Sequence, residues 1–156
     1  MTEQYLAAIS LIERLHRHFL NVVKLELDSS DIRDTNNVQA TILFNLGDAE
    51  MSVGELTLRG CYLGSNVSYN LKKLVENGYV EQARSSHDRR STHVRLTPKG
   101  HALRDRLAAM HRRHAESLQC VITAPDLEHA AATLSRLERF WVRVSDQASP
   151  SGRLVA

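Results

Sequence analysis

Polar side chains that can bind nucleic-acid bases are concentrated in one short segment, residues 65–77. This segment mixes serine, asparagine, tyrosine and lysine with apolar residues at every third or fourth position. Asparagine can pair with adenine through two hydrogen bonds, serine and tyrosine can bind base edges or phosphates, and lysine attracts phosphates. The candidates for this chemistry are Ser65, Asn66, Ser68, Tyr69, Lys72 and Lys73. The alternative for all of them is a solvated helix face.

A second set of candidates lies in a polar run between two segments of alternating character, 79–84 and 92–96. The alternation predicts a β-hairpin, and the run 85–90 would form its charged tip. An arginine at such a tip suits the minor groove of DNA, where a narrow groove deepens the negative potential. We expect Arg89 to enter the groove, with Arg90 as an almost equal alternative. The residues expected to support it on the phosphate backbone are Arg84, His87 and Arg95.

The formal net charge of +2 is unevenly distributed along the chain. Residues 1–58 carry four Lys and Arg against nine Asp and Glu, whereas residues 59–100 carry eight against three. The remaining residues carry eight against six. A basic centre favours one localised surface that binds a polyanion, with a solvated charged face as the alternative.

Two short helices are predicted to position the first set of candidates. Ser52 and Glu55 have the spacing of a capping box, which predicts a helix over 53–59. A tight connection follows, and a second helix is expected over 65–77, ended by Gly78. Its apolar face is formed by Val67, Leu71, Leu74 and Val75. Two helices joined in this way are typical of a helix-turn-helix.

Longer helices are predicted at both ends of the chain. Apolar residues recur at helical spacing over 3–27 and over about 35–46, where Gly47 provides a stop. Thr97 and Pro98 have the types expected at the start of another helix, and Pro125 opens the last one. The last helix carries an apolar stripe of Leu127, Ala131, Leu134, Leu137, Trp141 and Val144.

This stripe has an average step of about 3.5 residues, which suits packing against another long helix. The first helix carries a similar stripe, and neither is needed to support a small DNA-binding domain. The simplest use for both is burial against a second copy of the chain, which predicts a homodimer. The alternative is a helical layer within a monomer.

Two parts of the sequence together form a pattern known from one family of regulators. One part is Asp88-Arg89-Arg90 with the run from Val94 to Gly100, and the other is the pair of segments 52–56 and 67–81. The first resembles the wing and the following helix start of the MarR family of bacterial regulators, and the second resembles that family's helix-turn-helix. The turn Cys61-Tyr62-Leu63-Gly64 is more apolar than usual, and Asn70 stands where an apolar residue is common. These departures leave the phase of the recognition helix open.

The resemblance implies a mainly α fold of the α+β class, a winged helix-turn-helix with long N- and C-terminal dimerisation helices. We expect one winged-helix regulator domain over 1–148, with the DNA-binding core at about 35–97. The dimerisation helices would cover about 3–27 and 98–146, and residues 149–156 would form a disordered tail. Such a dimer would bind double-stranded DNA at a pseudo-palindromic operator.

The resemblance also implies roles for further residues. Asp88 would pair with an arginine, Arg90, and hold the wing in shape. A small-molecule effector, often aromatic or phenolic in this family, would bind where the dimer helices meet the winged part. The residues expected to line that site are Phe19, Val23, Phe44, Leu58 and Tyr62. Core packing is the alternative for each of them.

Other classes of function find little support in the sequence. We expect no enzyme and no cofactor, because no nucleophile has ordered His and Asp partners and no glycine loop could hold phosphates. The eight histidines lack a completing ligand set for a metal. Cys61 close to Arg59 leaves oxidation sensing as an alternative, and a winged-helix protein-interaction module is the rival to DNA binding.

The expected location is the cytoplasm. No apolar run approaches the length of a membrane span, and the first ten residues do not have the pattern of a secretory signal. Two cysteines do not form a disulfide framework, which fits a reducing compartment.

Overall fold

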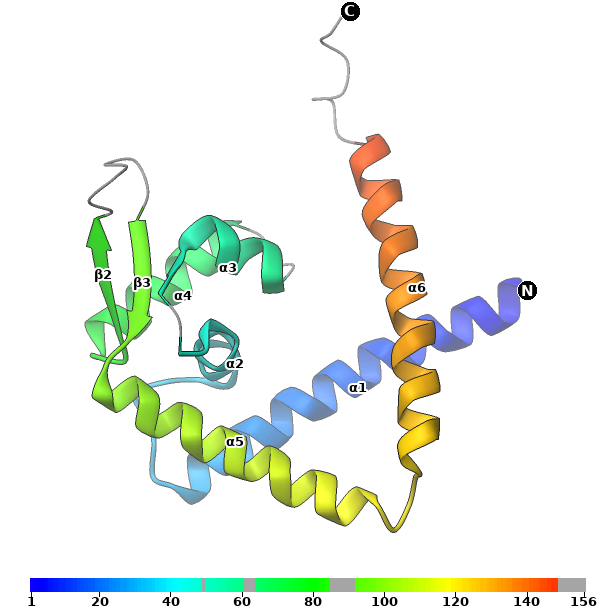
Figure 1. The fold of residues 1–156 in the computed structure, drawn as a ribbon, viewed down its shortest axis with the longest axis horizontal. Helices are drawn as coiled ribbons and strands as arrows, with labels where there is room; N and C mark the ends of the chain where they lie inside the picture. The colour runs from blue at the N-terminus through cyan, green and yellow to red at the C-terminus, as the bar shows by residue number, and fades with distance from the viewer. Residues whose placement is uncertain (49, 61–63, 85–91, 149–156) are drawn as a thin grey trace, which may run out of the picture. The chain divides into compact units, whose positions relative to one another are not determined.

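The computed structural model describes residues 1–48, 50–60, 64–84 and 92–148 of the chain. The helices are α1 (Thr2–Ser29), α2 (Asn37–Leu46), α3 (Val53–Gly60), α4 (Gly64–Glu76), α5 (Pro98–Leu118) and α6 (Ala124–Ala148), and the strands are β1 (Met51–Ser52), β2 (Val80–Arg84) and β3 (Thr92–Leu96) (Figure 1). Two compact units can be distinguished, residues 1–111 and residues 112–156. The predicted fold class, a mainly helical winged helix-turn-helix, is confirmed.

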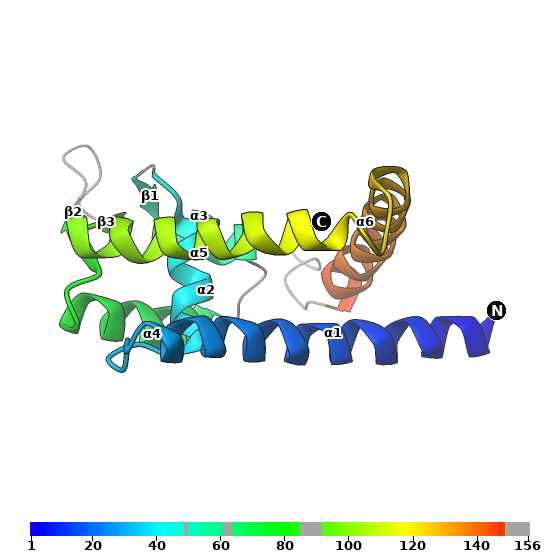
Figure 2. The same ribbon diagram turned by 90° about the horizontal axis from the view of Figure 1, so that it is seen from below.

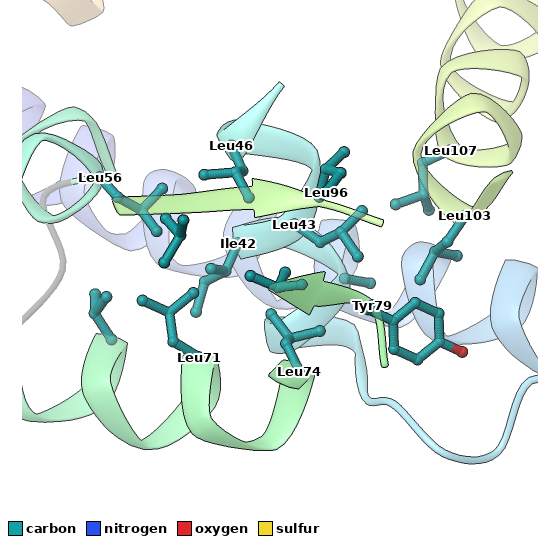
Figure 3. Packing of buried hydrophobic residues seen from close by; sticks show 14 of the residues in the cluster. Ile42, Leu43, Leu46, Leu56, Leu71, Leu74, Tyr79, Leu96, Leu103 and Leu107 are labelled. Atoms are coloured by element: carbon teal, nitrogen blue, oxygen red, sulfur yellow. The ribbon is translucent and has the colours of Figure 1, made fainter. Parts of the chain in front are cut away.

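The hydrophobic core belongs to the first unit and is centred on α2. Ile42, Leu43 and Leu46 of α2 are almost fully buried, and Figure 3 shows them among leucines of α3, α4 and α5. Figure 2 shows α2 crossing from α1 to α5. Because α2 is covered on nearly all sides, it packs α3, α4 and the sheet together with α1 and the first part of α5.

The hairpin predicted from alternation is present as an antiparallel pair, with Val80 opposite Leu96 and Arg84 opposite Thr92. Its tip lies outside the described residues. A third strand, β1, was not predicted, and it pairs with β3 so that Met51 is opposite Val94. Two residues are too few to show an alternating pattern, so the sequence could not predict this strand, which is defined only by its pairing with β3.

Local signals set most helix ends. The capping box before α3 is confirmed, since the Glu55 backbone N–H donates to Ser52 Oγ at 3.1 Å and the Ser52 N–H donates to Glu55 Oε2 at 2.7 Å. A second capping box, of Asn36 and Gln39, begins α2 slightly later than expected. Gly78 ends the turn after α4 with a φ of 74°, a conformation that favours glycine.

The second unit contains α6, whose described residues include none that is buried. The predicted stripe is therefore only partly covered in the single chain. Leu127, Leu134 and Val144 are each almost half exposed, and Leu137 and Trp141 are half-buried. The first two-thirds of α1 likewise contains no buried residue. The buried residues of this helix, Val23 and Leu27, lie in its last third. Among the described residues, no helix is long and apolar enough to cross a membrane.

Candidate nucleic-acid interface

The recognition helix α4 has one buried and one exposed face. Val67, Leu71 and Leu74 are at most 1% exposed, as the apolar spacing predicted. The opposite face presents Asn66, Ser68, Tyr69 and Lys72, with Tyr69 62% exposed. Ser65 is the second residue of the helix. Four of the predicted DNA contacts therefore lie together on one accessible surface.

Asn70 settles the phase of this helix. The side chain is 8% exposed, and its Nδ2 donates to the Asn66 backbone carbonyl at 2.8 Å. The amide therefore occupies a position on the buried face while its donor is satisfied within the helix itself. The departure from the family pattern leaves the exposed face unchanged.

The two lysines of α4 share an acidic neighbour. Lys73 Nζ lies 2.7 Å from Glu76 Oε2, and Lys72 Nζ lies 4.0 Å from Glu76 Oε1. The hydrogen bond from Lys73 lowers the pKa of Glu76, and the same bond raises the pKa of Lys73. Exposed ion pairs of this kind contribute little to stability, so both lysines can exchange the carboxylate for a phosphate.

At the base of the hairpin, the predicted Arg95 is engaged within the sheet. Its Nε donates to Glu81 Oε1 at 2.6 Å across the β2–β3 pair. Arg84 is the last residue of β2. The other wing residues, His87, Asp88, Arg89 and Arg90, lie outside the described residues, so their predicted roles remain predictions.

A surface hollow of about 540 Å³ separates α4 from the hairpin. Its polar walls come from Ser52, Ser68, Gln82 and Thr92. Hydroxyl and amide groups of this kind can donate to phosphate oxygens. Gln82 and Thr92 were not predicted, because only the register of the strands brings them beside the recognition helix.

A cluster of polar side chains lies just after the C-terminal end of α4. It consists of Asp34, Asn77, Tyr79 and Lys99 and is called the Asp34 cluster below. Asp34 accepts from the Tyr79 hydroxyl and from Lys99 Nζ, each at 2.6 Å, and its backbone carbonyl accepts from Asn77 Nδ2. Lys99 Nζ also donates to the Asn77 carbonyl at 2.8 Å and lies 4.1 Å from the centre of the Tyr79 ring. None of these residues was predicted as functional.

Charge and burial act against each other within this cluster. Burial alone would raise the pKa of Asp34, but the hydrogen bonds from Lys99 and Tyr79 and the charge of Lys99 hold that pKa below its usual value. Burial and the bond to Asp34 raise the pKa of Tyr79. A carboxyl with a lowered pKa in the folded chain stabilises the fold above its unfolded-state pKa. This contribution is lost as the pH falls through the folded-state pKa. Neutral pH lies above both the folded-state and the unfolded-state pKa of the carboxyl, so the contribution is present there.

Three of the predicted effector residues line one hollow. Phe19, Val23 and Phe44 surround a space of about 290 Å³. Its remaining walls are Thr41, Asn45, Leu107 and His111. Leu58 is not among them and is 80% exposed on α3, and Tyr62 lies outside the described residues.

His111 was not among the predicted effector residues, and the structure places it at this hollow. Its ring centre is 5.9 Å from that of Phe19 and 4.9 Å from that of Phe44. These distances fall in the range of favourable ring packing. The contact joins α1, α2 and α5 through residues that are distant in sequence.

The cysteines and acidic residues define no further site in the described chain. Cys120 is a free, exposed thiol, and Cys61 lies outside the described residues. Over the described ranges, no group of three or more His, Cys, Asp and Glu side chains could hold a metal ion.

Comparisons with known proteins agree with this geometry. Residues 36–100 match the family model of the winged helix DNA-binding domain. The exopolysaccharide II synthesis transcriptional activator ExpG of Rhizobium meliloti (strain 1021) is 37% identical over 142 residues, which cover 88% of this chain and 71% of ExpG.

Solved structures share the fold. The match to Streptococcus pneumoniae FabT, solved in complex with DNA, covers 90% of this chain and 99% of the FabT chain, with a TM-score of 0.73 and 20% identity. The match to a mutant MarR from E. coli, solved in complex with operator DNA, covers 88% of this chain and 97% of the MarR chain, with a TM-score of 0.72 and 19% identity. Both proteins therefore share the fold of this chain.

Proposed function

We propose that this chain, a member of the MarR family of winged-helix, DNA-binding transcriptional regulators, binds a pseudo-palindromic DNA operator as a homodimer under the control of a small molecule. The observation that carries this proposal is the two-faced recognition helix, with Val67, Leu71 and Leu74 buried and Asn66, Tyr69 and Lys72 exposed. FabT and MarR, with this fold, were solved in complexes with DNA.

In the proposed complex, α4 lies in the major groove with its N-terminal half on the base edges. Asn66 and Tyr69 contact bases, and Lys72 and Lys73 contact phosphates. The DNA backbone crosses the hollow between α4 and the hairpin, where Gln82 and Thr92 add uncharged donors. A wing arginine, Arg89 or Arg90, enters the adjacent minor groove.

The proposed dimer interface consists of α6 and the first part of α1. Both helices leave large apolar side chains exposed, including Leu11 and Leu15 of α1 and Leu134 and Phe140 of α6. Stripes of this kind are buried when a second copy supplies the matching surface. We place the protein in the cytoplasm, in contact with the chromosome.

Replacing Asn66 with alanine is expected to reduce sequence discrimination by about 1–3 kcal/mol, because a bidentate contact to one base would be lost. Duplexes selected from a random pool with the wild-type chain provide the ligand, and binding is measured by fluorescence anisotropy. The Asn66→Ala variant should bind the selected duplex more weakly while its affinity for random duplexes stays unchanged.

Lys72→Ala is the matched control on the same exposed face. Because a phosphate contact carries no sequence information, this variant should weaken binding to selected and random duplexes by the same factor. An equal loss on both duplexes for Asn66→Ala would assign that residue to positioning instead. Failure of the wild-type chain to enrich any duplex would favour a protein-interaction module.

The hollow at His111 is the proposed effector site. Its volume of about 290 Å³ is at the small end of ligand pockets, so it suits a compound of one ring. Phe19 and Phe44 provide the aromatic walls, while Thr41, Asn45 and His111 provide polar groups. No Lys, Arg, Asp or Glu side chain of the described residues lines it, so a carboxylate on the ligand would lie toward these polar groups or the solvent.

Benzoate, the simplest aromatic acid, is the probe for this site. At ten times its Kd, a ligand that binds only the folded chain adds about 1.4 kcal/mol of stability, or about 3–6 °C in melting temperature. Thr41→Phe should remove this shift by filling the hollow. Val38→Phe, on an exposed position of the same helix, should keep it. Equal shifts in both variants would place the ligand elsewhere.

A further inference from the structure

We propose that the Asp34 cluster is the rigid connection that sets the spacing between the two recognition helices of the dimer, so that Asp34 and Lys99 act as positioning residues for operator choice. This inference rests on the dimeric DNA binding proposed above. It concerns a part of the molecule far along α4 from its proposed DNA-contacting end. A dimer reads two half-sites whose separation must match that of its recognition helices.

The cluster joins the end of α4 to α5. Lys99, in the first turn of α5, reaches the carbonyl of Asn77 just after α4. Two residues earlier, the Thr97 hydroxyl donates to the Gly78 carbonyl at 2.7 Å, and the Thr97 N–H donates to the Tyr79 carbonyl at 3.1 Å. The recognition helix therefore cannot rotate about its C-terminal end without breaking bonds to α5.

The same cluster joins α4 and α5 to the segment after α1. Asp34 belongs to that segment, and it binds Asn77, Tyr79 and Lys99 at once. A further bond from Arg106 to the Ser30 hydroxyl, at 2.5 Å, ties the segment to α5 about two turns after Lys99. The cluster therefore links the end of α4, the start of α5 and the segment that follows α1.

Polar contacts are suited to this role because they are directional. Burial of Leu103, Leu107 and Met110 holds α5 against the core, but apolar burial has little directional preference. Hydrogen bonds lose their strength when the angle at the donor falls. Because the side chains of Asp34 and Lys99 are about half exposed, their ion pair alone contributes little to stability, and the directional constraint comes from the several bonds that the cluster makes together. Figure 3 shows Tyr79 at the edge of the apolar cluster with its hydroxyl directed away from the leucines.

The test compares spacing preference in the full-length chain. The selected duplex is altered by inserting two base pairs between its half-sites, which rotates one half-site by about 70°. The penalty is the ratio of Kd on the altered duplex to Kd on the selected duplex. We expect Lys99→Met to reduce this penalty by about fivefold or more, because charge-assisted bonds that fix the geometry are lost.

Asp34→Asn is the second variant, since asparagine keeps the side-chain shape and an acceptor for Tyr79, and it should reduce the penalty in the same direction. Lys24→Met is the matched control, because it removes an exposed ion pair of the same 2.6 Å length, to Asp28, within α1. Its penalty should equal that of the wild-type chain. Binding to a single half-site should be unchanged in all three variants.

The outcomes separate this inference from the proposed function. A wild-type penalty that persists unchanged in both cluster variants overturns the inference and leaves dimeric binding intact. The same holds if each variant merely binds every duplex more weakly, because a uniform loss reports stability alone. A wild-type chain that shows no spacing preference refutes the proposed dimeric binding, and this inference fails with it.

Discussion

Replacement of Gly100 by alanine is expected to lower the free energy of unfolding by about 3 kcal/mol, near the upper end for overpacking. A Cβ at this position would overlap the backbone carbonyl oxygen of Tyr79 and lie 3.2 Å from its carbonyl carbon and 3.3 Å from Leu96 Cβ. The Tyr79 carbonyl is held in place by bonds from Thr97. Neither backbone can move without disturbing the link between the sheet and α5.

Urea denaturation followed by circular dichroism measures this effect, and the melting temperature should fall by about 10 °C. Gly54→Ala is the matched control. A Cβ there has one ordinary contact, 3.8 Å from Ser52 Oγ, so alanine in this helical position should raise stability by up to about 1 kcal/mol. Equal stability of the Gly100→Ala and Gly54→Ala variants would show that the close approach of the Tyr79 carbonyl does not require glycine at position 100.

Replacement of Leu134 by glutamate is expected to weaken dimerisation at least about a hundredfold, equivalent to about 2.8 kcal/mol. Leu134 lies in the middle of the apolar stripe on α6 and is 47% exposed in the single chain. Two copies related by two-fold symmetry would each place a carboxylate in the proposed interface, so the cost of burying a charge is incurred twice. Operator affinity should fall with the dimer.

Sedimentation velocity at micromolar concentration distinguishes the dimer from the monomer. Ala132→Glu is the control, since it adds the same charge two residues away on the opposite side of the helix. That variant should remain a dimer. If Leu134→Glu sediments like the wild-type dimer, α6 does not form the interface through this stripe.

Features encoded by neighbouring residues were predictable from the sequence. The start of α3 at Ser52 and Glu55, the stop at Gly78 and the buried face of α4 all depend on residues within about one or two helical turns of each other. The same local logic predicted which side of α4 would be exposed, and therefore most of the candidate DNA contacts on that helix.

Features that depend on distant residues were not predictable in this way. Asp34 and Lys99 are 65 residues apart in the chain, and no local pattern marks either as a partner of the other. The β1 strand and the place of Gln82 beside α4 depend on strand register in the same manner. His111 meets Phe19 and Phe44 only because three helices converge.

The carboxylate of Glu76, placed against Lys72 and Lys73, has a consequence for how binding responds to salt. Each lysine that neutralises a phosphate releases condensed cations, which steepens the dependence of log K on log salt by about 0.9 per contact. In the proposed complex, Glu76 would stay beside the DNA and retain a counterion of its own. The pair of lysines should therefore contribute about one phosphate's worth of salt dependence, where two unaccompanied lysines would contribute about two.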